Sequence, residues 1–227
     1  MKKNFIYWCM FVFSVSFLSS CNEDKATKDD LLGTWNLRSN DAMDMAWESS
    51  ESMIISSIPV PTSVVAGMAA EYGSTQLQKE VKSITFKGNN TLEVTYLDDE
   101  TNAWKTEVYG TYRVINRKKL VFHPDADKLL EGVEGLSDAN LAEIKTLASK
   151  AGISVHFTFT GQSATGIRFY LDTNTIKEMK VLIPLLSGSI SGDSAEDVIL
   201  RTIFEALPGL LDKTDKIEIG LSFDKVV

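Results

Sequence analysis

The side chains with the clearest chemical potential in this chain surround the first of its two histidines. His123 is followed by Pro124, Asp125, Ala126 and Asp127, and a histidine with two carboxylates at short spacing could bind a divalent metal. The same segment ends a predicted strand and begins a predicted helix, where an aspartate stabilises the helix dipole. We therefore interpret Asp125 or Asp127 as a helix cap, and we expect no metal site and no cofactor.

The sequence offers no clear catalytic set. The second histidine, His156, lies on the polar face of a predicted strand together with threonines. No serine stands in a Gly-x-Ser-x-Gly elbow, and the glycine-rich run 187–192 has no following lysine to complete a phosphate loop. The carboxylates at 98–100 fall in a predicted hairpin turn, where solvated charge is expected. We expect that the protein is not an enzyme.

Methionines and aromatic residues gather between residues 38 and 79, in what we predict to be an insertion without strands. A helix is predicted from Thr62 to Gly73, with one apolar face running from Val64 to Tyr72. Methionine fills irregular space and repacks easily, so these side chains suit either a ligand mouth or a core. The candidate ligand mouth consists of Met43, Met45, Trp47, Met53, Met68 and Tyr72.

The rest of the chain alternates between apolar and polar residues as antiparallel strands do. The predicted strands are 82–87, 92–96, 104–114, 120–122, 153–160, 167–171 and 217–223, besides one that begins near residue 33. Helical spacing predicts helices within 124–150, from Asn174, and from Asp193 to Pro208. About eight strands close a small barrel. We expect a mainly β fold with helical insertions: an antiparallel barrel or strongly curved sheet with one end covered or plugged by helices.

The N-terminal segment has the build of a secretory signal peptide. Lys2 and Lys3 precede an uncharged apolar run from Phe5 to Leu18, which is too short for a comfortable membrane span. The following Leu18-Ser19-Ser20-Cys21 resembles the lipobox of bacterial lipoproteins, whose cysteine is acylated and becomes the first residue after cleavage. The resemblance implies a mature chain that is held on a membrane by acyl chains on Cys21.

Cleavage there changes the charge and the thiol content of the chain. The full chain has a net charge of -8, and loss of two lysines makes it about -10. Such a chain repels nucleic acid and anionic lipid headgroups, so we exclude a nucleic-acid partner and expect attachment through the lipid. The only other cysteine, Cys9, leaves with the signal peptide, so the core must stabilise the fold without disulfides.

Residues 22–30 are polar and predict a flexible tether. Acidic residues after the acylated cysteine resemble export tags of some Gram-negative lipoproteins. We therefore predict an outer-membrane lipoprotein, with surface exposure favoured over the periplasmic face. The predicted division is a signal peptide at 1–20, a lipidated tether at 21–30 and one domain at 31–227.

The start of the domain carries a family likeness. In Leu31-Leu32-Gly33-Thr34-Trp35, the Gly-Thr-Trp resembles the GxW of lipocalins, whose tryptophan closes the bottom of the barrel. With the lipobox, the strands paired around Gly161 and the apolar helices before the last strand, the chain resembles lipocalin-like lipoproteins of unknown function from gut Gram-negative bacteria of the Bacteroides type. It departs from true lipocalins in its higher helical content and in having no arginine within 217–223 to stack on Trp35.

Two functional hypotheses follow. In the first, the barrel holds a small apolar or amphipathic ligand beneath the candidate ligand mouth. In the second, helices plug the barrel, and the protein is a non-enzymatic accessory lipoprotein that contacts a partner protein of the envelope or a glycan. The faces of the helices at 64–72 and 198–207 decide between them, since they either roof the lumen or fill it.

Overall fold

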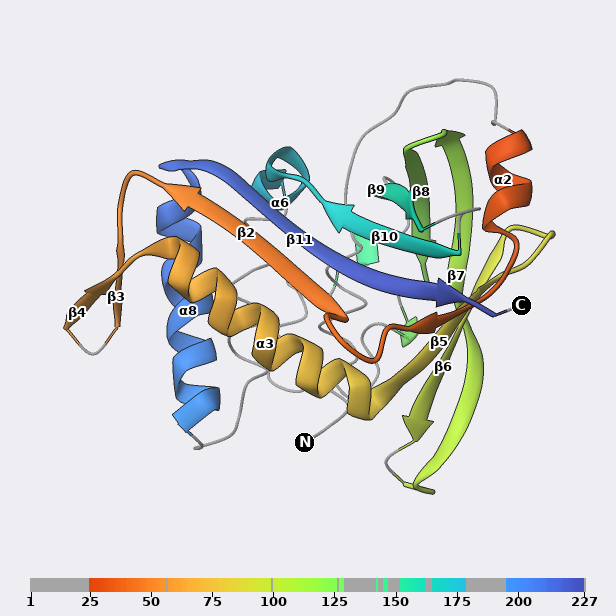
Figure 1. Ribbon diagram of the computed structural model, residues 1–227, viewed down its shortest axis with the longest axis horizontal. Helices are drawn as coiled ribbons and strands as arrows, with labels where there is room; N and C mark the ends of the chain where they lie inside the picture. The colour runs from red at the N-terminus through yellow and green to blue at the C-terminus, as the bar shows by residue number, and fades with distance from the viewer. Residues whose placement is uncertain are drawn as a thin grey trace.

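The computed structural model describes residues 25–55, 57–98, 100–125, 127–128, 142, 145–146, 152–161, 165–178 and 195–226. Cys21, the predicted signal peptide and most of the predicted helical segment 124–150 lie outside these residues. The described chain is mainly β, with helices beside one large sheet (Figure 1).

The large sheet and the small hairpin contain the following strands: β1 Gly33–Leu37, β2 Met43–Ser49, β3 Met53–Ile55, β4 Ile58–Val60, β5 Val81–Phe86, β6 Thr91–Asp98, β7 Ala103–Asn116, β8 Lys119–Pro124, β9 Ile153–Thr160, β10 Gly166–Leu171 and β11 Thr214–Lys225. The described helices are α2 Lys25–Leu31, α3 Thr62–Glu80, α6 Thr173–Glu178 and α8 Ala195–Leu211.

Eight strands pair in a closed antiparallel ring. The order runs β1-β5-β6-β7-β8-β9-β10-β11, and β1 returns to β11 with Trp35 opposite Lys225 and Leu37 opposite Phe223. The ninth strand, β2, pairs with the other end of β11, while β3 and β4 pair with each other and with no other described strand. The predicted mainly β fold with a large antiparallel sheet is confirmed.

Strand β2 corrects the prediction of an insertion without strands. It continues the line of β1 along β11, and the Ser222 N–H donates to the Ala42 carbonyl at 2.9 Å between the two pairings. Methionine and alanine favour strands weakly, so the alternation in Met43–Ser49 is easily missed until pairing with β11 imposes it. The outer edge of β2 is covered by α3, where Ser74 Oγ accepts from the Met43 N–H at 2.9 Å and donates to its carbonyl at 3.1 Å.

One end of the ring is closed by α2, which occupies residues predicted to be a flexible tether. Thr27 and Leu31 are buried, and burial of this apolar side stabilises the short helix against the strands. Trp35 Nε1 donates to the Leu31 carbonyl at 2.8 Å. Lys225 Nζ donates to the Asp30 carbonyl at 2.9 Å and lies 5.0 Å from the centroid of the Trp35 ring. A cation from the last strand therefore stacks on Trp35 after all, two residues beyond the segment searched for an arginine.

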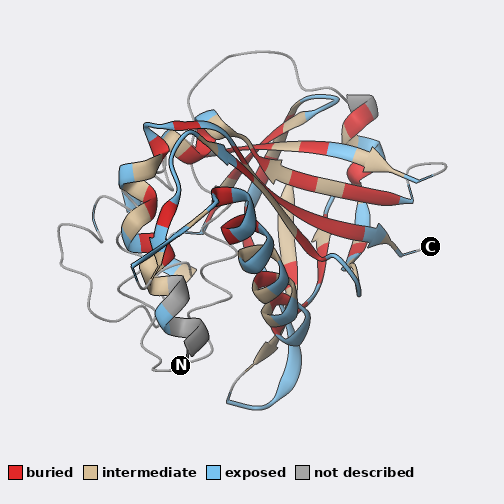
Figure 2. Cartoon of the chain, turned by 60° about the vertical axis from the view of Figure 1, so that its left-hand side comes forward, coloured by how far each residue is buried: buried red, intermediate tan, exposed pale blue. Residues whose placement is uncertain are grey.

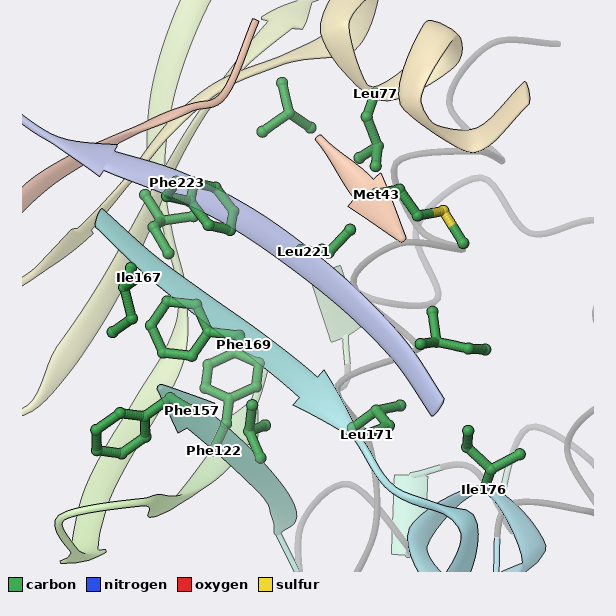
Figure 3. Packing of buried hydrophobic residues seen from close by; sticks show 14 of the residues in the cluster. Met43, Leu77, Phe122, Phe157, Ile167, Phe169, Leu171, Ile176, Leu221 and Phe223 are labelled. Atoms are coloured by element: carbon green, nitrogen blue, oxygen red, sulfur yellow. The ribbon is translucent and has the colours of Figure 1, made fainter. Parts of the chain in front are cut away.

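Inward-facing residues of the ring form a packed aromatic core. Figure 3 shows the rings of Phe157, Phe169 and Phe223 gathered beside β10 and β11. Met43 and Leu77 extend the same cluster between β2 and α3. The largest fully buried side chains are Trp35, Trp47, Tyr112, Phe157, Phe169, Phe223, Leu31, Met53, Leu77, Ile167 and Leu171.

The inward face of β7 differs from the prediction in its first half. Trp104 and Val108 are exposed, because a bulge opposite Leu92 and Glu93 shifts the alternation by one residue. Gly110 lies in this bulge, and a Cβ there would come within 2.2 Å of the His123 carbonyl oxygen. Only glycine fits this close approach of β7 and β8.

The helices also differ from their predicted limits. α3 continues through Gly73 to Glu80, so this glycine does not end the helix. Gly73 instead lets the helix pack closely on β2, since a Cβ there would come within 2.2 Å of Met43 Sδ. α8 continues through Pro208 to Leu211, whose side chain is fully buried. α6 is capped by Asp172 in place of the predicted Asn174, since Asp172 Oδ1 accepts the Thr175 N–H at 2.9 Å. The predicted capping residue Asp193 lies outside the described residues.

Candidate functional site

The residues of the candidate ligand mouth separate into buried and exposed members. Met43, Trp47 and Met53 belong to the core, and Trp47 Nε1 donates to Thr214 Oγ1 at 2.9 Å. Met45 and Tyr72 are half-buried, while Met68 lies on the surface of α3. The structure thus places three of these side chains in the packing between β2, α3 and β3.

A small cavity lies inside the ring. It has a volume of about 30 Å³, and its walls are apolar. The lining residues are Ile84, Phe86, Leu92, Val94, Tyr112, Leu120, Phe122, Val155 and Phe169. Sites for small molecules usually measure about 300–1,000 Å³. At this level the ring is filled by its own side chains.

An exposed apolar surface lies on the β3–β4 hairpin and the first turns of α3. We call it the hairpin surface, and it consists of Ile54, Ile58, Val64 and Met68, which are 59%, 63%, 50% and 42% exposed. Figure 1 shows the hairpin projecting at the end of the molecule opposite α2. Figure 2 shows that α3 has one buried side and one exposed side, and Val64 and Met68 belong to the exposed side.

The predicted face of α3 is therefore wrong in part. Val65, Ala66 and Leu77 turn to the core, and Val64 and Met68 turn to solvent. Helical spacing identified the apolar residues of this helix, but it cannot separate a wide apolar face into the part that packs on β2 and the part that stays open.

The hairpin surface is also uncharged. The sequence from Ser52 to Ala70 contains no Asp, Glu, Lys or Arg, although these make up 24% of the chain. Glu51, just before the hairpin, pairs with Lys213. Exposed apolar side chains in a segment without charges are typical of surfaces that bind another macromolecule.

The histidine and carboxylates of the predicted cap lie at the end of β8. Asp125 Oδ1 accepts the backbone N–H of Asp127 at 3.1 Å and of Lys128 at 3.3 Å, which is the capping role predicted for it. Burial, and then the nearby charge of Arg113, lower the pKa of His123. Asp127 pairs with Lys145 at 2.7 Å.

His156 lies on the outer face of β9, in a polar group that sequence patterns did not reveal. Its Nε2 is 3.2 Å from Asp172 Oδ2, and its ring stacks on Tyr170 with 5.4 Å between centroids. Burial lowers the pKa of His156, although the charge of Asp172 opposes this. Tyr170 also contacts Arg168, whose guanidinium lies 4.8 Å from the centroid of the tyrosine ring.

Arg168 joins three strands on this outer face. It binds both carboxylate oxygens of Asp44 on β2, with Nε donating to Oδ2 at 2.8 Å, and its Nη2 lies 2.6 Å from Glu218 Oε1 on β11. A Cβ at Gly220 would come within 2.6 Å of both Arg168 and Asp44. These hydrogen bonds raise the pKa of Arg168. The groups satisfy one another, so we assign the cluster to holding β2 on the ring.

Cys21, the predicted lipid attachment site, lies outside the described residues. No helix in the described part of the chain is long and apolar enough to cross a membrane. Comparison of the chain with protein-family models, with curated proteins and with solved structures finds no match.

Proposed function

We propose that this chain is a non-enzymatic, lipid-anchored protein of the bacterial cell envelope that binds a partner protein through the hairpin surface. The observation that carries the proposal is the exposed, uncharged apolar surface at the end of the molecule opposite α2. Burying an exposed isoleucine contributes about 1.5–3 kcal/mol, so two of them at one hairpin make a strong contact for a partner with an apolar groove.

The predicted anchor supports this orientation. Cys21 precedes Lys25, the first residue of α2, by four positions. Four extended residues span at most about 14 Å, so acyl chains on Cys21 would keep α2 close to the membrane. The hairpin surface, at the other end of the long axis in Figure 1, then points away from the membrane toward other envelope proteins.

We also propose that the ring is a lipocalin-like barrel whose interior is packed. The support is the eight-strand ring, the Gly33-Thr34-Trp35 opening on β1 and the cation of Lys225 over Trp35. A small apolar ligand remains the competing proposal. Such a ligand needs a cavity several-fold larger than the one of about 30 Å³ that the described residues enclose within the ring, and this supports the partner protein.

The first experiment tests the anchor. The full chain is expressed in a Gram-negative host, and its intact mass and membrane fractionation are compared with those of Cys21→Ser. We expect acyl chains on the mature wild-type chain and a non-acylated Cys21→Ser variant. A wild-type mass that fits no cleavage before Cys21 and no acylation would contradict the proposal.

The second experiment tests the surface. A photo-crosslinker is placed at Ser63, which is exposed beside Val64, and the complexes are compared among wild type, Ile54→Ser with Ile58→Ser, and a control with Val108→Ser. Val108 is also exposed but lies on β7, far from the hairpin in the chain. We expect one stoichiometric partner that the double variant loses at least tenfold and the control retains. Equal crosslinking yields in wild type and the double variant would contradict the partner-protein proposal. A small molecule that stays bound to the chain in native mass spectrometry would favour the competing proposal.

A further inference from the structure

The two exposed isoleucines of the β3–β4 hairpin lie on opposite faces of it. Side chains alternate between the two faces along a strand, and residues directly opposite each other on paired strands share a face. The register places Ile54 opposite Pro59, and Ile55 opposite Ile58. Ile54 and Pro59 therefore lie on one face, and Ile55 and Ile58 on the other. Because Ile54 is 59% exposed and Ile58 is 63% exposed, the hairpin presents apolar side chains to solvent on both faces.

The base of the hairpin is anchored in the molecule, whereas its tip is not. Met53 and Val60 pair at the base, on the same face as Ile58. Met53 is buried, and Val60 and Ile55 pack against the core. Ile58 lies nearer the turn and remains exposed on this face, while Pro59 is exposed on the opposite face. The tip therefore projects from the molecule with both faces accessible (Figure 1).

This arrangement limits the shape of a partner's binding site. A flat surface can cover one face of a hairpin, so it would bury Ile54 or Ile58 and leave the other side chain in water. A cleft with two walls covers both faces of an inserted tip at once. Burial of both isoleucines therefore requires a concave site on the partner.

The hairpin also limits the chemistry of that site. The segment from Ser52 to Ala70 contains no charged residue, so a charge on a wall of the cleft would lose its hydration without gaining an opposite charge. Pro59 has no backbone N–H, and proline in an edge strand hinders the addition of a further strand. Side chains, rather than strand pairing along β4, must therefore make the contact, and apolar walls suit them.

We propose that the tip of the β3–β4 hairpin inserts into an apolar cleft of the partner protein, with one isoleucine against each wall. This inference rests on the proposed function and specifies the site that the partner must offer. The partner is a different protein, since two copies of this chain, each with a net charge of -8, repel each other. Lipid is disfavoured because the predicted anchor precedes α2, at the end of the molecule opposite the hairpin (Figure 1).

Single substitutions test the two faces separately. Ile54→Ser removes the apolar side chain from one face and Ile58→Ser from the other, and both positions are exposed, so the fold should survive. The photo-crosslinker at Ser63 is used in wild type, in each single variant and in the control Val108→Ser. We expect each single variant to lower the yield of the crosslinked partner about tenfold or more, because each isoleucine is buried in the complex. The control should keep the yield of wild type.

A second photo-crosslinker at Ser57, which is exposed in the turn, tests insertion of the tip. We expect it to capture the same partner as the crosslinker at Ser63. If one of the single variants keeps the yield of wild type, the partner covers only one face, and the insertion proposal is overturned while the proposed function stands. Crosslinks from Ser57 to lipid or to a second copy of the chain would overturn the insertion proposal as well. If neither crosslinker captures a protein, the proposed function fails, and the insertion proposal fails with it.

Discussion

Phe169 lies at the centre of the ring, with three aromatic neighbours around it. Its ring centroid is 5.6 Å from that of Phe86, 6.1 Å from that of Phe157 and 6.0 Å from that of Phe223. These partners come from three other strands, β5, β9 and β11. The Phe169 side chain therefore fills space between several strands of the ring. If it were removed, the movement of one loop could not close the void.

The variant Phe169→Ala should lower the free energy of unfolding by about 3–5 kcal/mol, because it removes buried apolar area and leaves a cavity. Urea unfolding followed by tryptophan fluorescence measures the change. The control Val108→Ala, at a side chain that is 41% exposed, should change stability by less than about 1 kcal/mol. Similar losses in the two variants would contradict a packed interior.

Both histidines link stability to pH. Burial lowers the pKa of His123 and of His156 below the ordinary value of 6.5, so the unfolded chain binds protons more readily than the folded one. Their contribution to stability is complete above the unfolded pKa and is lost as the pH falls through the folded pKa. We expect Tm to fall as the pH is lowered from about 7 to about 5, and to fall less in His156→Gln. If the change of Tm with pH is the same in His156→Gln as in wild type, His156 does not contribute to the pH dependence of stability.

At the scale of elements, α3 offers two glycines with opposite surroundings. Gly67 has no atom within 4 Å of an added Cβ, whereas Gly73 would place its Cβ 2.2 Å from Met43 Sδ. The first position is free to accept a side chain. The second allows α3 to lie close against β2, where Ser74 also binds the Met43 backbone.

Gly67→Ala should raise the free energy of unfolding by about 0.5–1 kcal/mol, because alanine is the better helix former. Gly73→Ala gains the same propensity, but it must displace the buried Met43 side chain, and we expect a net loss of stability. Thermal unfolding of the two variants provides a matched comparison within one helix. A gain in both would mean that α3 does not pack closely on β2.

The elements also show how far sequence patterns reach. Alternation predicted β5, β6, β8, β9, β10 and β11 because these strands place apolar residues on the single inner face of the ring. It missed β2 and reversed the face of Trp104, since neither pairing with β11 nor the bulge at Gly110 is encoded in local periodicity. α2 was missed because its burial depends on contacts with distant strands.

For the candidate functional residues, too, the sequence predicted the clustering but not the exposure of each side chain. The clustering of Met43, Met53 and Met68 was visible in the sequence, but which of them are buried depends on how α3 lies on β2. The exposure of Ile54 and Ile58 likewise depends on the position of their hairpin, whose two strands pair with no other strand of the described chain.

At the scale of the molecule, the described residues form the closed ring and, beside it, a layer of β2, α3 and the β3–β4 hairpin. The ring strand β10 is hydrogen-bonded to β9 on one side and to β11 on the other. The hairpin strands pair with each other, with no other strand among the described residues, and expose Ile54 and Ile58. Local stability should therefore differ between the ring and the hairpin.

Native-state hydrogen exchange should show this difference directly. We expect the amides of β3 and β4 to exchange by local opening, and those of β10 only with global unfolding, so that protection differs by several orders of magnitude. The edge strand β2, which Ser74 and Arg168 hold in place, should lie between these limits. Equal protection of the hairpin and β10 would mean that the hairpin is part of the ring's cooperative unit.

The position of β11 in the chain has a consequence for how the protein is made. This strand pairs with β10, β1 and β2, and it follows all three in the sequence. During synthesis, the ring cannot close until the ribosome has released residues 214–225. Pairing of β1 with β11 across almost the whole chain is a contact of very high sequence separation, and such topologies fold slowly. This order suits the secretion that we propose, because the strand that completes the fold emerges after the others have passed.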